Sequence, residues 1–382
     1  MRRPELRESL LEALGDVDRL VLLGDVLELR HGPMRDAMEA ARPVFEDLGR
    51  ALQGGELVLV AGNHDHALVE PWLSRRGEES DPPPLGLEQL LEPELVSAAY
   101  ARIAGWAAPA RVRVAYPGLW LREDVYATHG HYLDCHLTVP TLERLTVGAM
   151  TRLLGRPAQA FRSVADYEAV GAPLFAWRDA VARDAQTGAA LNGLATVGAW
   201  RALGGSARDG EAGSGRSVRA RPSRGAGAGA ARRASLRAAV RRRLLVAGFP
   251  LAVVALNRAG VGPLSADISA QELRRAGLRA MDEVSVRLGL GEAYVMFGHT
   301  HRAGPLPGDD LSEWRGREGA RLINAGSWTY SSIFLGGSPS ESPYWPGACV
   351  VVHDEGEPRV MRLLQDRTRE QIRSPRLGAA RG

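Results

Sequence analysis

The sequence predicts an α/β protein whose core is interrupted by a long helical insertion. Two observations lead to this fold class. Short apolar runs that are typical of strands alternate with segments of helical periodicity over residues 1–132, and such runs return over residues 291–365. Between them, residues 133–290 are mostly helical in pattern. We therefore expect one core made from two stretches of chain, a helical cap inserted between them, and a polar tail at residues 366–382.

The individual elements follow from the spacing of apolar residues. In the first part of the core we predict strands at residues 20–23, 57–60 and 125–128, a hairpin of residues 111–115 and 119–122, and helices at residues 5–14, 35–53 and 87–105. In the insertion the predicted helices are residues 139–154, 165–183, 233–256 and 270–288. In the second part of the core we predict strands at residues 293–297 and 321–324 and a hairpin of residues 349–353 and 359–364.

Length and composition limit the classes of protein to consider. At 382 residues and 45% hydrophobic content, the chain has room for two domains or for one domain with a large insertion. The net charge of +3 is small for this length, so an extended nucleic-acid-binding surface is not expected. Cys135 and Cys349 are too few for a disulfide framework, which favours a reducing, cytoplasmic location. No signal peptide is visible, and the longest apolar run, residues 244–256, is shorter than the about 20 residues of a bilayer span.

The insertion contains two segments of unusual composition. Residues 204–231 are rich in Gly, Ala, Ser and Arg and have almost no large apolar residue, so this segment is predicted to be disordered. Residues 216–243 hold ten arginines and no acidic residue, and the apolar run follows directly. Residues 216–256 are therefore a candidate for peripheral contact with a membrane or a lipid. The alternative is a solvated linker followed by a core helix that is kinked at Pro250.

Residues suited to metal binding follow four of the predicted strands. These motifs are Gly24-Asp25, Gly62-Asn63-His64-Asp65, His129-Gly130-His131 and Gly298-His299-Thr300-His301. Ligands of open α/β sheets bind at the carboxyl ends of strands, which is where these residues stand. Carboxylate, amide and imidazole groups together suit a divalent ion such as Mn, Fe or Zn.

In this order, the four motifs resemble those of the calcineurin-like metallophosphoesterase superfamily, over about residues 15–132 and 291–365. The resemblance implies a four-layer α-β-β-α sandwich that binds two divalent metal ions. It also implies that a metal-bound hydroxide attacks a phosphomonoester, a phosphodiester or a pyrophosphate. On this resemblance Asp25 would bridge the two ions and His301 would belong to the second site. The remaining ligands of the first site would be Asn63, His129 and His299.

Further residues near these motifs have predicted supporting roles. By the same resemblance, His64 would stabilise charge on the leaving oxygen or protonate it. Asp65 and Glu28 are predicted to orient imidazoles through hydrogen bonds. His131 is interpreted as facing the substrate, as supporting the ligands, or as a turn residue; Arg302 as a substrate-phosphate contact or a surface arginine. The histidines that we interpret as structural are His31, His66, His136 and His353.

One motif of the family has no counterpart. The family carries Asp-x-His on its opening strand, and no histidine precedes Gly24 in this sequence. Without those two ligands, the second metal site would hold only Asp25 and His301. We expect that the sequence is truncated at its N-terminus and that the missing part encodes this strand. The alternative is a non-catalytic or single-metal scaffold on the same fold.

The expected function is therefore hydrolysis of a small phosphorylated substrate. The run Gly298-His299-Thr300-His301-Arg302 and the helical cap resemble the branch of the family that hydrolyses UDP-diacylglucosamine, but the cap of this chain is longer and differently composed. A nuclease is a further alternative, which the modest net charge disfavours.

Overall fold

The computed structural model of the chain describes residues 4–29, 33–184, 253–265, 267, 270–330, 335 and 341–372. The predicted disordered segment 204–231 lies outside the described residues, as does His31. The predicted lipid-contact segment 216–256 and the predicted helix 233–256 lie outside them up to residue 252. None of the helices in the described part combines the length and the apolar composition that a bilayer crossing requires. Both cysteines are free thiols.

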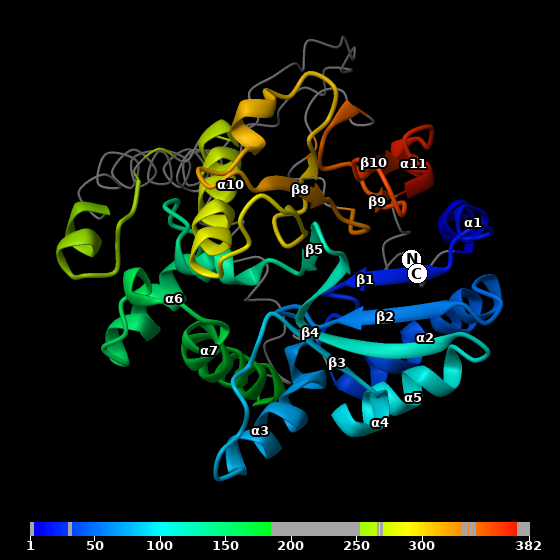
Figure 1. Ribbon diagram of the computed structural model, residues 1–382, viewed down its shortest axis with the longest axis horizontal. Helices are drawn as coiled ribbons and strands as arrows, with labels where there is room; N and C mark the ends of the chain where they lie inside the picture. Colours follow the sequence, from blue (N-terminus) through cyan, green and yellow to red (C-terminus); the bar gives the residue numbers. More distant parts are fainter. Residues whose placement is uncertain are drawn as a thin grey trace, which may run out of the picture.

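Eight strands form one mixed sheet that curls through the centre of the molecule (Figure 1). Its order is β1-β2-β4-β5-β6-β8-β7, with β3 paired to β4. The strands are β1 (Arg19–Leu23), β2 (Glu56–Val60), β3 (Glu88–Leu91), β4 (Arg111–Arg122), β5 (Val125–Thr128), β6 (Tyr294–Phe297), β7 (Ala303–Gly304) and β8 (Arg321–Ala325). As predicted, β9 (Ala348–Val351) and β10 (Arg359–Arg362) form an antiparallel pair. Helices flank the sheet, so the predicted α/β class is confirmed.

Strand β4 joins the two halves of the sheet. Its first half runs parallel to β2, and this pairing ends with Val60 opposite Ala115. Its second half runs antiparallel to β5, whose last residue Thr128 lies opposite Gly118. The predicted hairpin of residues 111–115 and 119–122 is therefore wrong, because the two runs belong to one continuous strand.

The dipeptide Pro117-Gly118 accounts for this error, because such a pair is typical of a turn. Pro117 has no N–H to donate, but it lies between the last residue that pairs with β2 and the first that pairs with β5. On the other side of β4 the register shifts, and Glu88 of β3 stands opposite both Pro117 and Gly118. A proline is tolerated within a strand at such a bulge.

The same registers bring the carboxyl ends of β2 and β5 together. Ala115 pairs with both β2 and β3, and Gly118 pairs with both β3 and β5. Strands β2 and β5 therefore lie on the same side of β4, and they point at each other with only Tyr116 and Pro117 of β4 between their ends. Because β1 is parallel to β2 and β6 is parallel to β5, the carboxyl ends of all four strands lie beside this part of β4.

Apolar side chains alternate between the two faces of the sheet. In β2, Leu57 and Leu59 pack in one core cluster with helices α2 (Met34–Ala51) and α5 (Ala98–Trp106), whereas Val58 and Val60 belong to an inner cluster. Strand β6 alternates in the same way between the inner cluster and a third cluster that includes α10 (Ala270–Arg287). The inner cluster thus contains residues from both halves of the sheet.

Two further expectations need correction. Residues 87–105, predicted as one helix, contain β3, α4 (Pro93–Val96) and α5. Pairing of β3 with β4 overrides the helical spacing, and Pro93 occupies the start of a new helix, where its missing N–H costs nothing. The predicted polar tail is packed in part, because α11 (Arg369–Ile372) buries Ile372 against the cluster that includes Leu6 and Trp345.

The described helices of the insertion pack directly on the core. Helices α6 (Leu142–Leu153), α7 (Val164–Asp184) and α10 share one hydrophobic cluster with β5, β6 and β8. Figure 1 shows α6 and α7 beside the sheet, and α10 close to β8. The predicted boundary at residue 290 therefore places in the insertion a helix that covers the sheet.

A buried carboxylate anchors α7 to the core. Tyr116 of β4 and Tyr132 of the 3-10 helix η2 (His131–Cys135) both donate hydrogen bonds to Oε1 of Glu168, the first at 2.7 Å. Nε2 of His66 lies 3.8 Å from the other carboxylate oxygen. Burial, and then the charge of Glu168, raise the pKa of both tyrosines well above its usual value, so both phenols stay protonated as donors.

We predict that Glu168→Ala lowers the free energy of unfolding by about 2–4 kcal/mol, because two buried phenols lose hydrogen bonds to a charged acceptor. Glu168→Gln keeps an acceptor oxygen for both tyrosines and should lose less than half as much. Urea unfolding followed by circular dichroism measures both. Equal losses in the two variants would show that these hydrogen bonds do not anchor α7.

A second prediction concerns acid stability. Nε2 of His136 lies 2.8 Å from the Tyr167 hydroxyl, and burial, followed by the charge of Arg287, lowers the pKa of His136 from 6.5 to about 4. The unfolded chain therefore takes up this proton below pH 6.5, and the folded chain only near pH 4. Unfolding should become easier as the pH falls through this window, by about 2–3 kcal/mol from this group.

In His136→Gln, the loss of stability between pH 7 and pH 4.5 should be smaller than in the unchanged protein. The exposed His353 provides the matched control, and His353→Gln should leave the pH dependence as it was. Urea unfolding at the two pH values measures the change in the free energy of unfolding for each variant. An unchanged slope in His136→Gln would contradict the prediction.

Candidate metal centre

The two turns that carry the first ligands require glycine. Asp25 adopts a left-handed backbone conformation with φ 53° and follows Gly24 with φ 85°. A Cβ on Gly24 would stand 2.3 Å from Nδ1 of His129, and a Cβ on Gly62 would stand 2.2 Å from Oδ1 of Asp25. Because it has no Cβ, Gly24 lets the turn after β1 approach the side chain of His129. In the same way, Gly62 lets the turn after β2 approach the side chain of Asp25.

Asp65 connects these turns. Its Oδ1 accepts a hydrogen bond from the backbone N–H of Gly62 at 2.7 Å, and its Oδ2 accepts one from Val26 at 2.8 Å. Longer contacts reach the amides of Asp25 and Leu27. Burial, and then the neighbouring charge of Asp25, raise the pKa of Asp65. Asp65 thus holds backbone amides of two loops, rather than the imidazoles that we predicted it to orient.

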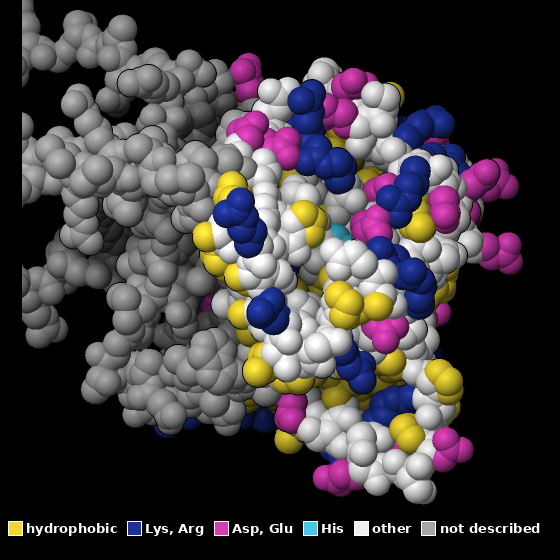
Figure 2. Space-filling view, turned by 90° about the vertical axis from the view of Figure 1, so that its left-hand side faces the viewer, with side chains coloured by type: hydrophobic (Ala, Val, Ile, Leu, Met, Phe, Trp, Pro, Cys, Tyr) yellow, Lys and Arg dark blue, Asp and Glu magenta, His cyan; other side chains and the backbone are white. Residues whose placement is uncertain are grey.

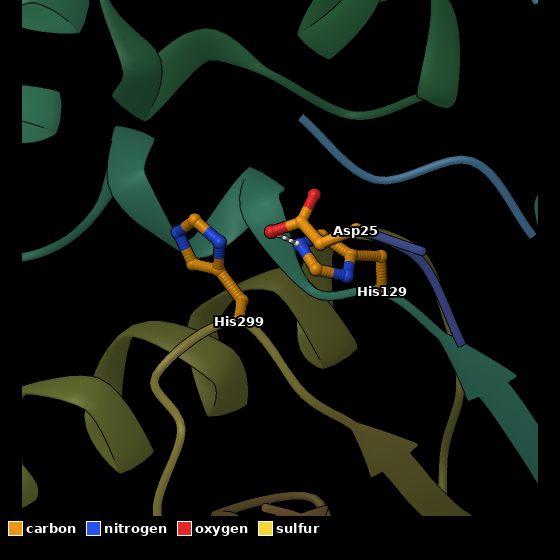
Figure 3. Close-up of side chains that lie close together, drawn as sticks. All are labelled: Asp25, His129 and His299. Atoms are coloured by element: carbon orange, nitrogen blue, oxygen red, sulfur yellow. Dashed lines mark ion pairs between the residues drawn. The ribbon is translucent and has the colours of Figure 1, made fainter. Parts of the chain in front are cut away.

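Asp25, His129 and His299 form a group that could hold a metal ion (Figure 3). One ligand atom of each lies within 4.8 Å of the other two. Nε2 of His129 is 3.3 Å from Oδ2 of Asp25. The sequence placed all three at the ends of β1, β5 and β6, and the structure brings them together.

The second ring nitrogen of each histidine is already occupied. Nδ1 of His129 lies 2.9 Å from the carbonyl oxygen of Leu23, which makes it an N–H donor and leaves Nε2 as the nitrogen that faces Asp25. Nε2 of His299 lies 3.0 Å from Oδ2 of Asp134, and Figure 3 shows the other ring nitrogen on the side of Asp25. Metal-ligating histidines are oriented in this way by a carbonyl or a carboxylate. The donor set and its supports fit a divalent ion.

Asp134 is the supporting residue that the sequence did not predict. It lies in η2, is buried, and makes its hydrogen bond to His299, which is 165 positions further along the chain. The only local signal is a carboxylate that follows the His129-Gly130-His131 motif by three residues. Its role depends on the contact between η2 and the loop after β6.

The electrostatics of the group favour a carboxylate with imidazole partners. Burial alone would raise the pKa of Asp25, but the charges of His129 and His64 and a hydrogen bond from His129 hold it well below its usual range. Burial would lower the pKa of His129, whereas the charge of Asp25 raises it above its usual value. Asp25 is thus ionised in the folded protein, as a metal ligand must be.

His64 lies at the rim of this group and is partly exposed. Its backbone N–H donates to Oδ1 of Asp25 at 2.8 Å, and its Nε2 is 3.9 Å from Oδ2 of the same residue. Its Nδ1 lies 2.7 Å from Oε2 of Glu28, so Glu28 orients this imidazole as predicted. With a side chain 31% exposed, His64 can meet a group that arrives from solvent.

The remaining predicted ligands, Asn63 and His301, lie close to the group, and their ligation stays a prediction. Asn63 is buried at 2% exposure in the turn between Gly62 and His64. His301 adopts φ 62°, a left-handed conformation that it shares with His299. Burial lowers the pKa of His301 to about 4, and its electrostatic neighbours include Asp25 and His299.

Arg302 and His131 are buried, at 7% and 4% exposure. Arg302 donates to Asp309 at 2.6 Å and lies over the ring of Trp314, so the alternative of a surface arginine is wrong. Its predicted substrate contact is untested. The ring of His131 lies 5.6 Å from that of His129 between centroids. Burial, and then the charges of His129 and His299, lower the pKa of His131 well below its usual value.

The surface on the face seen in Figure 2 carries interspersed arginine and acidic side chains in its described part, with little histidine exposed. Searches against models of known protein families, curated proteins and solved structures found no match to this chain.

We predict that Asp65→Asn lowers the affinity for Mn²⁺ by about 10–100-fold, the usual cost of removing a group that orients metal ligands. An amide has one acceptor oxygen, whereas the carboxylate accepts backbone amides with both of its oxygens. Calorimetric titration with Mn²⁺ measures the change. The exposed Asp81 gives the matched control, since Asp81→Asn should bind as the unchanged protein does. Equal affinities in both variants would refute the role of Asp65.

Proposed function

We propose that this protein is a metal-dependent hydrolase of phosphoesters, of the calcineurin-like metallophosphoesterase type. The observation that carries the proposal is the group of Asp25, His129 and His299, whose ligand atoms lie within 4.8 Å of one another at the ends of three strands. The ordered motifs of the sequence support the same type. The substrate class that we propose is a small phosphorylated molecule, with the cytoplasm as the location.

The four-layer α-β-β-α sandwich is part of this proposal. In its support, one core cluster joins β1, β2 and β4 to α2 and α5, and another joins β5, β6 and β8 to α10. The inner cluster, which includes Val58, Ala115, Ala127 and Met296, has members from both halves of the sheet. Helix, half-sheet, half-sheet and helix would then be the four layers.

Each side chain of the site has a task in this proposal. Asp25, Asn63, His129 and His299 would hold one ion, and Asp25 with His301 would contribute to a second. Manganese, iron and zinc are the ions that this donor set suits. When bound, such an ion supplies Lewis-acid chemistry, activating a water molecule and neutralising charge on the phosphoryl group.

His64 would act on the leaving group. Its contact with Glu28 at 2.7 Å orients the ring. Nε2 would then be the atom that donates a proton to the leaving oxygen when its bond to phosphorus breaks. The partly exposed position of His64 allows a substrate to reach this atom.

A single-metal or non-catalytic scaffold is the second candidate. It is favoured by one observation: within the described residues, the His, Cys, Asp and Glu side chains form one group with metal-binding geometry. Measuring metal content after loading with Mn²⁺ separates the two, because the two-ion hydrolase binds about two equivalents and the single-metal scaffold binds one. Contact of residues 216–256 with lipid is a separate proposal that the described residues do not address, and nucleic-acid binding is not proposed.

We predict that Mn²⁺-loaded protein hydrolyses p-nitrophenyl phosphate or its diester, that EDTA removes the activity and that Mn²⁺ restores it. His64→Ala should lower kcat by about 10²–10⁴-fold, the usual contribution of a general acid, with Mn²⁺ affinity nearly unchanged. His353→Ala serves as the control. Failure of the unchanged protein to hydrolyse either ester, or full activity in His64→Ala, would refute the proposed chemistry.

A further inference from the structure

His131 is a buried imidazole in aromatic surroundings. It begins η2 directly after Gly130 and is 4% exposed. Its ring centroid lies 4.8 Å from that of Tyr132, 5.4 Å from that of Phe175 and 5.6 Å from that of His129. Phe175 belongs to α7, so the inserted helix covers one side of this imidazole.

Neither ring nitrogen of His131 has a hydrogen-bond partner within the part of the chain that the structure describes. The two comparable histidines differ. His66, at 1% exposure, has the Tyr116 hydroxyl at 3.3 Å, and His129, at 2% exposure, has the Leu23 carbonyl at 2.9 Å. Buried polar atoms are nearly always paired, so an unpaired imidazole needs a reason to be there. If packing were its only task, phenylalanine would suit its aromatic neighbours better, because it has no polar atoms to desolvate.

The position of His131 indicates what it would bind. It is two residues after His129, and their rings are adjacent, so it lies beside the candidate metal centre on the side of α7. It does not belong to the group whose ligand atoms lie within 4.8 Å of one another. This placement suits contact with a molecule bound at the centre better than contact with the ion itself. The strongest partner for an imidazole N–H is an anionic oxygen.

We propose that His131 binds the substrate, donating a ring N–H to a phosphoryl oxygen. This inference rests on the proposed function and deepens it, because it places the phosphoryl group between the metal centre and α7. His131 is then a binding residue whose donor nitrogen is satisfied only in the complex. Leaving that N–H unpaired is a cost to folding that ligand binding removes.

Replacing His131 by phenylalanine separates packing from binding. The probe is inorganic phosphate, titrated calorimetrically into Mn²⁺-loaded protein, and Tm and Mn²⁺ affinity are measured in parallel. In His131→Phe, Tm should be unchanged or higher, Mn²⁺ affinity should change less than threefold, and phosphate affinity should fall at least tenfold. His131→Gln retains an N–H donor, so its phosphate affinity should lie between those of His131→Phe and the unchanged protein.

The matched control is His66→Phe. His66 is equally buried and its ring also contacts Phe175, at 4.9 Å between centroids. This variant leaves the Tyr116 hydroxyl without its histidine neighbour, so Tm should fall while phosphate affinity is kept. Opposite effects of two buried His→Phe changes would distinguish a binding histidine from a structural one.

Three results would overturn the inference. Phosphate affinity that is unchanged in both His131→Phe and His131→Gln would make the residue structural, and a parallel fall in Mn²⁺ affinity would make it a metal ligand. Absence of phosphate binding to the Mn²⁺-loaded unchanged protein would also refute it. A failure of the proposed hydrolase function can be distinguished from these results, because the unchanged protein would then bind phosphate but hydrolyse no ester. In that case the His131 variants would still test whether His131 contacts the bound phosphate.

Discussion

The candidate site depends on the pairing of β4 with two strands that meet end to end. Tyr116 and Pro117 form the gap between β2 and β5, and the carboxyl ends of both strands open into it. Strands β1 and β6 run parallel to β2 and β5, so their carboxyl ends lie at the same gap. A flat sheet with one strand direction could collect ligands at one edge only. Here one continuous strand joins two oppositely directed parallel sets, so that ligands from both converge.

The geometry at this point is held by contacts from outside the donor set. Asp65 gathers backbone amides of two loops, the Leu23 carbonyl orients His129, and Asp134 orients His299. These partners determine which nitrogen of each imidazole faces Asp25. Glycines complete the arrangement, since a Cβ at Gly24 or Gly62 would overlap the side chains that converge there. The group is thus preorganised, and its reorganisation on binding an ion would be small.

Helix α7 of the insertion packs against residues that support the candidate metal centre. Glu168 of α7 accepts hydrogen bonds from a residue of the β4 gap and from a residue of η2, the turn that also carries His131 and Asp134. Phe175 lies against His131 and His66. Movement of α7 would therefore disturb the same turn that orients the ligands. This coupling follows from the packing of the described residues, whatever the substrate.

The sequence by itself determined the α/β class, most helices and strands, and the ligand candidates at strand ends, because apolar periodicity and short polar motifs are local. It did not determine that residues 111–122 are one strand, since the turn tendency of Pro117-Gly118 yields to pairing with β2, β3 and β5. Nor did it determine the partners of Asp134, Arg302 and His131. Only the tertiary structure decided these, because burial and hydrogen bonding between distant segments have no periodic signature in the chain.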